Sequence, residues 1–171
     1  MGLLWLFTAA TGAAKCQDVK IVTLTKYLSN CLYNFSRNIN WPEENKLGDF
    51  IIAIIGNKDV FNEMSKLTQN MRVGMQPMVV KFFGTVAELN GFQHIVFVDE
   101  WQSSKMKLLL QKTSGNNTLI VTETEGLIER GSMINFISVN GLMQFEMNLE
   151  NLKKNNLMAS SVLEKMARAA N

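Results

Sequence analysis

The sequence is poor in the residues that most often carry catalysis or bind metal ions. Its 171 residues include one histidine, His94, and two cysteines. Nucleophilic triads and zinc sites generally use histidine as a base or a ligand, so a single copy leaves few such sites open. His94 stands directly before the apolar run Ile95–Val98, and we interpret it as a residue at the entry of a strand. The composition therefore leaves few options for a catalytic or metal site, and we expect no bound cofactor or metal.

A concentrated basic surface is also lacking. The 17 Lys and Arg residues nearly balance the 15 Asp and Glu residues, which leaves a formal charge of +2. The densest basic spot is the pair Lys153 and Lys154, and asparagines surround it. Because nucleic-acid binding needs basic residues gathered on one face, we expect no nucleic-acid partner.

Long hydrophobic runs are absent as well, although the start of the chain is apolar. A bilayer span needs about twenty apolar residues, and no segment supplies them. Residues 1–14 carry no charge, and they place Leu3–Phe7 before the small residues of Ala9–Ala14. This pattern is typical of a secretory signal, although the basic start of such a signal is missing and a buried first helix is the alternative. We expect residues 1–14 to be removed on export, leaving 15–171 as a single domain that does not insert into the membrane.

The two cysteines do not predict a disulfide. Cys31 lies inside an apolar helical stripe, which is typical of a free buried thiol. Cys16 would be almost terminal once the signal is removed, so it is poorly placed to cross-link the domain. An exported protein can form disulfides, but we expect none here.

The loop after the first buried strand lacks phosphate-binding chemistry. The apolar run Phe50–Ile55 ends in Gly56-Asn57-Lys58-Asp59, which contains neither a G-x-G-x-x-G motif nor a Lys-Ser/Thr ending. A phosphoacceptor receiver would also need acidic residues at this strand end to hold a cation near an acceptor such as Asp99. The carboxylates of Glu123, Glu125 and Glu129 could do acid–base work, but nothing in the sequence brings them together. A hydrolase or receiver-like enzyme is thus the least supported class.

Short apolar runs that alternate with helical patterns dominate the chain. An amphipathic helix runs from residue 24 to 39 and ends before Trp41-Pro42, and Asp59 can cap a second helix. We expect strands at 50–55, 78–83, 94–98 and 118–122, with helices at 59–67 and 103–110. Buried strands alternating with helices predict an α/β fold with a mostly parallel, doubly wound sheet.

The last third of the chain has a different pattern. Runs 133–139 and 142–147 flank Asn140-Gly141, the pair favoured in a tight type I′ turn, and so predict an antiparallel hairpin. Asn148 can cap a short helix, and Ser160 or Ser161 can begin a last one. We therefore expect a C-terminal hairpin and helices added to the parallel sheet.

Two stretches carry a resemblance to a known family. The first is Tyr33-Asn34-Phe35 followed by Ile39-Asn40-Trp41-Pro42. The second runs from Glu125-Gly126 through Glu129-Arg130-Gly131-Ser132-Met133-Ile134-Asn135-Phe136, then Asn140-Gly141 and Phe145-Glu146-Met147-Asn148-Leu149, to Ser160-Ser161 and Leu163. In order and spacing the sequence resembles the YfiR family over nearly the whole predicted mature chain.

The resemblance implies function by binding rather than by catalysis. YfiR-family proteins are periplasmic regulators, and the type member restrains a membrane diguanylate cyclase through its periplasmic sensor part, which lowers cyclic di-GMP output. For this chain the resemblance implies a periplasmic protein whose partner is the periplasmic domain of a membrane sensor, a cyclase or a kinase. A small-molecule sensor of the same fold is the alternative. The cysteines that allow redox control in YfiR have no counterparts in residues 71–171, so disulfide switching is not expected.

The partner surface is predicted along the hairpin and the loop before it. Leu142–Met147 would form a sheet edge whose only polar side chains are Gln144 and Glu146, and such edges pair readily with other chains. Gly131 supplies a turn before the hairpin, and Asn135 interrupts an apolar strand, so its amide should bond to a neighbouring loop. Our candidate partner-binding residues, for a homodimer or for the sensor, are Glu129, Arg130, Met133, Asn135, Leu142, Gln144 and Glu146.

Overall fold

The structure, a computed structural model, describes the backbone of residues 11–169 and the side chains of residues 22–167. Of the predicted signal, residues 1–10 lie outside this range and residues 11–14 form the first turn of helix α1. Within the described range, no helix has both the length and the apolar character needed to span a bilayer.

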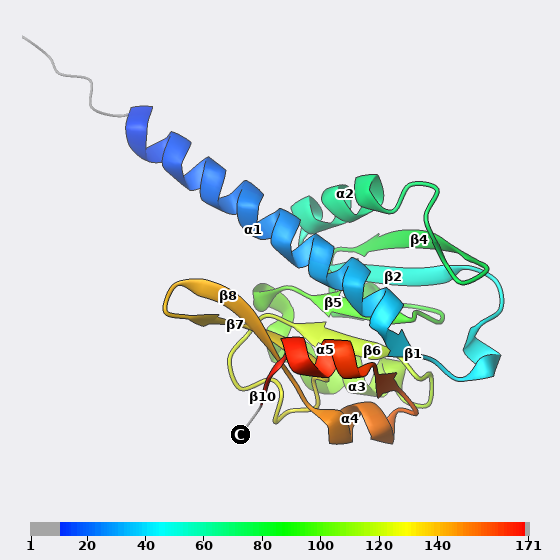
Figure 1. Ribbon diagram of the computed structural model, residues 1–171. Helices are drawn as coiled ribbons and strands as arrows, with labels where there is room; N and C mark the ends of the chain where they lie inside the picture. Colours follow the sequence, from blue (N-terminus) through cyan, green and yellow to red (C-terminus); the bar gives the residue numbers. More distant parts are fainter. Residues whose placement is uncertain (1–10, 170–171) are drawn as a thin grey trace, which may run out of the picture.

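The predicted alternation of strands and helices is confirmed (Figure 1). The α-helices are α1 (Thr11–Asn38), α2 (Lys58–Leu67), α3 (Met106–Thr113), α4 (Leu149–Lys154) and α5 (Ser161–Met166). Short 3-10 helices are η1 (Glu43–Asn45), η2 (Val86–Glu88) and η3 (Glu100–Lys105). The strands are β1 (Ile39–Asn40), β2 (Phe50–Ile55), β3 (Arg72–Val73), β4 (Gln76–Phe83), β5 (Ile95–Val98), β6 (Leu119–Thr122), β7 (Ile134–Val139), β8 (Leu142–Met147), β9 (Met158–Ala159) and β10 (Arg168–Ala169).

The main sheet has the strand order β10-β8-β7-β6-β5-β2-β4-β3. The central pairs β4–β2, β2–β5, β5–β6 and β6–β7 are parallel, and the β7–β8 and β3–β4 pairs are antiparallel. From β2 the chain crosses through α2 to β4 in one direction, and from β5 it crosses through α3 to β6 in the other. Because such crossovers are right-handed, α2 and α3 cover opposite faces of the sheet. The predicted doubly wound α/β fold is confirmed.

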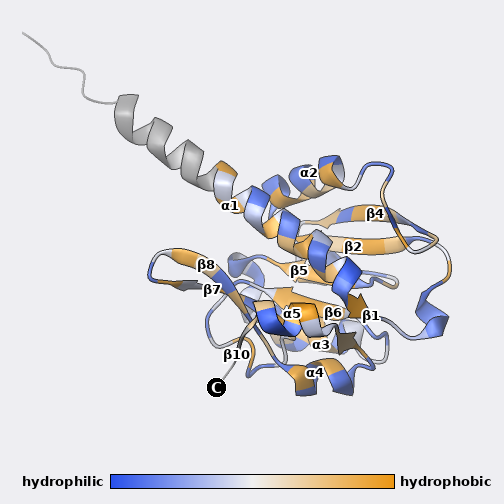
Figure 2. Cartoon of the chain, viewed as in Figure 1, coloured by the Kyte–Doolittle hydropathy of each residue, from blue (hydrophilic) through white to orange (hydrophobic). Residues whose placement is uncertain are grey.

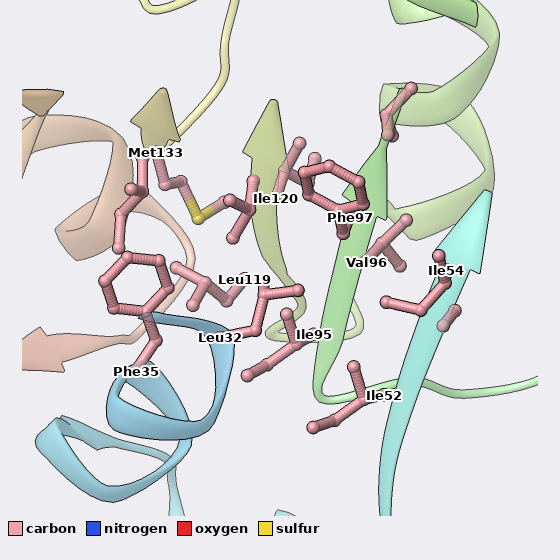
Figure 3. Packing of buried hydrophobic residues seen from close by; sticks show 14 of the residues in the cluster. Leu32, Phe35, Ile52, Ile54, Ile95, Val96, Phe97, Leu119, Ile120 and Met133 are labelled. Atoms are coloured by element: carbon pink, nitrogen blue, oxygen red, sulfur yellow. The ribbon is translucent and has the colours of Figure 1, made fainter. Parts of the chain in front are cut away.

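Helix α1 covers one face of the sheet and supplies much of the core. Leu28, Leu32 and Phe35 recur at steps of three and four residues and are all buried. Figure 3 shows Leu32 and Phe35 directed toward Ile95 and Leu119 on the central strands. These strands are coloured mostly hydrophobic in Figure 2, as expected for strands covered on both faces.

Three details differ from the sequence prediction. Helix α1 begins at Thr11 rather than at residue 24, since no proline interrupts the preceding segment. Asn57 rather than Asp59 caps α2, because the Asn57 side chain accepts a hydrogen bond from the backbone N–H of Val60. Cys31 is a free thiol, and it is half-buried rather than buried as the sequence predicted. Burial raises the pKa of this thiol, whereas its hydrogen bond with Tyr27 lowers it.

His94 joins the amino ends of β2 and β5 to the segment before β2. Its Nδ1 accepts a hydrogen bond from the backbone N–H of Ile51 at 3.0 Å, so Nε2 carries the proton and donates to the carbonyl of Asn45 at 2.7 Å. Its ring stacks on Phe50 and meets the ring of Trp41 edge to face. The Trp41-Pro42 corner therefore packs over a buried histidine, and this contact gives the first family stretch a structural role.

Candidate functional site

The carboxyl ends of β5 and β6 bring acidic residues together. Asp99 and Glu100 follow β5, and Glu123 follows β6, its parallel neighbour. The carboxyl ends of adjacent parallel strands meet at one edge of a sheet, where doubly wound proteins bind their ligands. There the backbone N–H of Glu100 donates to Oε1 of Glu123 at 3.3 Å.

A groove of about 670 Å³ lies beside this edge, between the loop after β6 and the β7–β8 hairpin. Four carboxylates line it, those of Glu123, Glu125, Glu129 and Glu146. The remaining wall comes from Gly126, Ile128 and the β7 residues Phe136, Ile137, Ser138 and Val139. The fold thus brings Glu146 to the three glutamates of the loop after β6, and the groove is negatively charged.

Glu123 has an unusual pKa for a glutamate. Burial raises its pKa to about 7, and the neighbouring charges of Asp99 and Glu100 act in the same direction. The hydrogen bond from the Glu100 backbone favours the ionised form and opposes these effects. Glu123 therefore changes its charge near neutral pH, in the lining of the groove.

A network of buried polar side chains holds Glu146, one of the residues that line the groove. Asn135 is fully buried on β7, and its Nδ2 donates to Oε1 of Glu146 on the facing strand at 2.9 Å. The Thr122 hydroxyl donates to Oδ1 of Asn135 at 2.7 Å and lies 2.8 Å from the Ser132 hydroxyl, which donates to the carbonyl of Ile134. The predicted hydrogen bonding of the Asn135 amide is confirmed, although its partners are side chains of the neighbouring strands rather than a loop. The network fixes the Glu146 carboxylate in place.

The loop that forms the other wall is held by backbone geometry and by α4. Gly131 has a φ of +105°, and a Cβ there would lie 3.0 Å from the Leu110 side chain, so the predicted special turn at Gly131 is confirmed. Asn151 on α4 donates through Nδ2 to the carbonyls of Ile128 and Ser132. The loop from residue 123 to residue 132 is therefore anchored at its closing end.

The structure divides the candidate partner-binding residues into two groups. Glu129 and Glu146 line the groove, Arg130 is exposed beside it, Leu142 is 67% exposed near the hairpin tip and Gln144 is half-buried. Met133 and Asn135 are buried, and Figure 3 shows Met133 beside Ile120 in the core. These two side chains position the surface and present none of it to a partner.

The β8 edge is shorter than the sequence predicted. Strand β10 pairs in parallel with β8, with Arg168 opposite Glu146 and Ala169 opposite Met147, so only the part of the edge near the tip is open. The backbone N–H of Asn148 donates to Met133, and hydrogen-bonded pairs alternate along an antiparallel ladder. The pair of Ile137 and Gln144 is therefore hydrogen-bonded, and the amide of Gln144 faces β7 rather than the edge.

The groove offers limited catalytic chemistry. His94 lies at the opposite, amino end of the sheet, so it cannot act as a base beside Glu123. Within the described side chains, no three His, Cys, Asp or Glu residues are grouped so that they could hold a metal ion. The arrangement suits the recognition of positive charge better than bond cleavage.

Sequence reasoning missed the supporting residues Thr122, Ser132 and Asn151. These are small polar residues separated by ten or more positions, and no spacing rule joins them. The position of Glu123 could have been found, because it directly follows a predicted parallel strand and such strand ends converge.

Comparison with known proteins gives one family match. A family model described as YfiR/HmsC-like matches residues 25–168, which include both stretches that carry the resemblance, and it therefore covers most of the chain. No curated protein matches the chain.

Proposed function

The chain belongs to the YfiR/HmsC-like family, and from this premise we propose that it is an exported, non-enzymatic regulator that binds the periplasmic part of a membrane sensor. The sensor is a diguanylate cyclase, or a kinase in the same role, and binding lowers its output. The family match over residues 25–168 is the observation that carries the proposal.

The groove and the hairpin tip are the surface we propose for the sensor. Glu129 and Glu146 line the groove, Arg130 flanks it, and Leu142 gives the tip an exposed apolar anchor. Protein interfaces commonly have an apolar centre, which Leu142 would supply here, and a charged rim, which the groove residues would supply. Rim charges mainly set the association rate and exclude wrong partners. A homodimer through the open part of the β8 edge would use the same tip, so we expect dimerisation and sensor binding to compete.

Co-expression with a membrane diguanylate cyclase from the organism that carries the gene tests this proposal. Cyclic di-GMP is measured with the wild-type chain, with Arg130→Glu, with Leu142→Asp and with a control, Lys66→Glu, on the exposed side of α2. We expect the wild type and Lys66→Glu to lower cyclic di-GMP equally, and the two surface variants to lose at least tenfold in affinity for the purified periplasmic domain.

The outcomes separate the function from the surface. If the wild-type chain leaves cyclic di-GMP unchanged and does not bind the domain, the regulatory function is wrong. If both surface variants bind and repress as Lys66→Glu does, the function stands and the sensor binds elsewhere. Analytical ultracentrifugation of the same variants shows whether the tip also forms the homodimer.

The second candidate is a small-molecule sensor of the same fold. The volume of the groove, about 670 Å³, lies in the range of ligand pockets, and its four carboxylates favour a cationic ligand. A cationic ligand would raise the melting temperature of the wild type, and less so that of Glu146→Gln. Equal shifts in both proteins would contradict binding in this groove.

A further inference from the structure

The outer edge of β4 presents backbone groups that no strand of the described chain covers. β4 pairs with β2 along Met78–Phe83, but β3, its other neighbour, reaches only Gln76 and Pro77. Just beyond β3, the backbone N–H of Met78 donates to the carbonyl of Met71 at 3.0 Å. The edge is then open up to Phe83, and Figure 1 shows β4 as the outermost long strand on this side of the sheet.

The unpaired backbone groups of this edge belong to Val80 and Phe82. They can be assigned because the N–H and C=O groups of successive residues point to opposite sides of a strand. The amide of Met78 points outward, whereas the carbonyl of Phe83 accepts a hydrogen bond from Gly56 and so points toward β2. Alternation between these two fixed points directs the N–H and C=O of Val80 and Phe82 outward. Two donors and two acceptors are therefore available to an added strand.

Within β4, the open stretch Val79–Phe83 is apolar except for Lys81, and Lys58 of α2 lies beside it. Val79, Val80, Phe82 and Phe83 are half-buried, and Lys81 in their middle is exposed. Nζ of Lys58 lies 4.4 Å from the ring centroid of Phe82. The ion pairs among the described side chains are Lys46–Glu43 and Lys154–Glu150, so neither of these lysines is neutralised by a salt bridge.

A second copy of the chain has only one register available along this edge. Two-fold pairing centred on Val80 would need the amide of Met78, which is bonded to Met71. Pairing centred on Phe82 would need the amide of Gly84, which donates to Oε2 of Glu88 at 2.9 Å.

The remaining register places Val80 of one copy opposite Phe82 of the other. Lys81 then stands directly opposite Lys81 at a position where Cα atoms are about 4.5 Å apart. Like charges directly opposite one another destabilise a sheet, so Lys81 protects the edge against self-pairing. The same charge favours a strand that carries an acidic residue at this position.

We propose that the β4 edge binds an extended segment of a partner protein as an additional antiparallel strand, with an aspartate or glutamate of that segment opposite Lys81. Val80 and Phe82 supply the backbone hydrogen bonds, and this mode of recognition takes its specificity from alternate side chains. The residues two places before and after the acid lie beside Val79 and Phe83 and are therefore apolar. The edge thus reads the pattern apolar–any–acidic–any–apolar, and it does so independently of the groove and of the sensor.

Selection from a random twelve-residue peptide library displayed on phage, with the full chain as bait, tests this proposal. We expect the enriched peptides to carry an acidic residue with apolar residues two places to either side. Synthetic versions of these peptides should bind the wild type and a control, Lys107→Glu on the exposed side of α3, with equal affinity. Lys81→Glu should weaken their binding at least tenfold, and replacing the peptide acid with lysine should restore it. Val80→Pro removes an outward donor and should abolish binding.

Backbone hydrogen exchange gives a readout that does not depend on a variant folding. In the free protein the amides of Val80 and Phe82 should exchange faster than those of Val79 and Lys81, and a bound peptide should slow them. The proposal is overturned if no acidic pattern is enriched, if Lys81→Glu and Lys107→Glu bind the peptides equally, or if the amides of Val80 and Phe82 are already protected in the free protein.

Discussion

The side-chain amide of Asn135 donates a hydrogen bond of 2.9 Å to the carboxylate of Glu146 across the β7–β8 pair. This bond joins a fully buried residue to one that lines the groove, so the core determines where a surface charge lies. The other end of the amide accepts from Thr122, which leaves no spare polar atom on Asn135 to contact a ligand.

Replacing Asn135 with alanine should destabilise the protein by about 1–3 kcal/mol, because the buried hydroxyl of Thr122 loses one of its two partners and Oε1 of Glu146 loses its donor. Ser138→Ala on the exposed part of the same strand should change the free energy of unfolding by less than about 0.5 kcal/mol. Urea denaturation measures both variants. Equal effects would mean that the network contributes nothing to stability.

Glu123 should make the protein less stable as the pH rises toward neutrality. Its pKa is about 7 in the folded protein, against an ordinary value of 4.5, so the folded state holds its proton more tightly than the unfolded state does. This contribution is fully present below pH 4.5 and is lost as the pH rises through 7. Glu123→Gln should remove the trend and stabilise the protein above pH 7 by about 1 kcal/mol. Unfolding curves of the two proteins from pH 5 to 8 should diverge, and parallel curves would contradict the shift.

Much of the fold could be predicted from the sequence, because local patterns specify it. The uninterrupted run Phe50–Ile55 marked a strand covered on both faces, and Asn140-Gly141 marked the hairpin, whose turn residues both have positive φ. The short β10 strand at residues 168 and 169 was missed, because two residues carry no periodicity. Its pairing with β8 depends on the tertiary fold, and this is why the predicted free edge was too long.

The candidate site was less predictable than the fold, because its residues come together only in the folded chain. The family stretch led us to choose Met133 and Asn135 as partner-binding candidates together with Glu129 and Glu146. Their burial in the structure shows that Met133 and Asn135 support the surface from the core and are not part of it. The acidic groove depends on the loop after β6 lying beside the β7–β8 hairpin, and sequence distance does not reveal this contact.

Export should remove the start of the chain. The uncharged residues 1–14 combine an apolar segment with small residues, which is the pattern that signal peptidase recognises. Mass spectrometry of the protein from a periplasmic extract should therefore give a mass that lacks about fourteen residues. An intact chain that begins at Met1 and stays in the cytoplasm would contradict this prediction.

Reductant should leave the stability of the protein unchanged. Cys31 is a free thiol that contacts Tyr27, and Cys16 lies fifteen residues earlier on the same helix, about 22 Å away along its axis. No disulfide can bridge that distance within one chain. Melting temperatures with and without reductant should agree within about 1 °C, and Cys31→Ser should behave alike in both conditions. A lower melting temperature in reductant would reveal a disulfide between two copies.

Acid should weaken the amino end of the sheet through His94. The ring is buried, and this burial lowers its pKa below the ordinary value of 6.5, although the hydrogen bond to the carbonyl of Asn45 acts in the opposite direction. Protonation would place a second N–H on Nδ1, against the backbone N–H of Ile51, and the 3.0 Å hydrogen bond between them would be lost. The neutral ring is therefore part of the native structure.

The sign of the pH effect follows from the lowered pKa. Below pH 6.5 the unfolded chain takes up a proton at His94 that the folded protein does not. The contribution of the neutral ring to the unfolding free energy is therefore fully present above pH 6.5. It decreases as the pH falls toward the pKa of His94 in the folded protein. His94→Gln should lower stability at every pH, because the stacking on Phe50 is lost, but it should remove this dependence on acid. The slope of the unfolding free energy between pH 6.5 and 5 is therefore the diagnostic quantity, and it is measured beside that of Glu123→Gln, which keeps His94. An equally steep fall in His94→Gln would show that another group causes the loss of stability in acid.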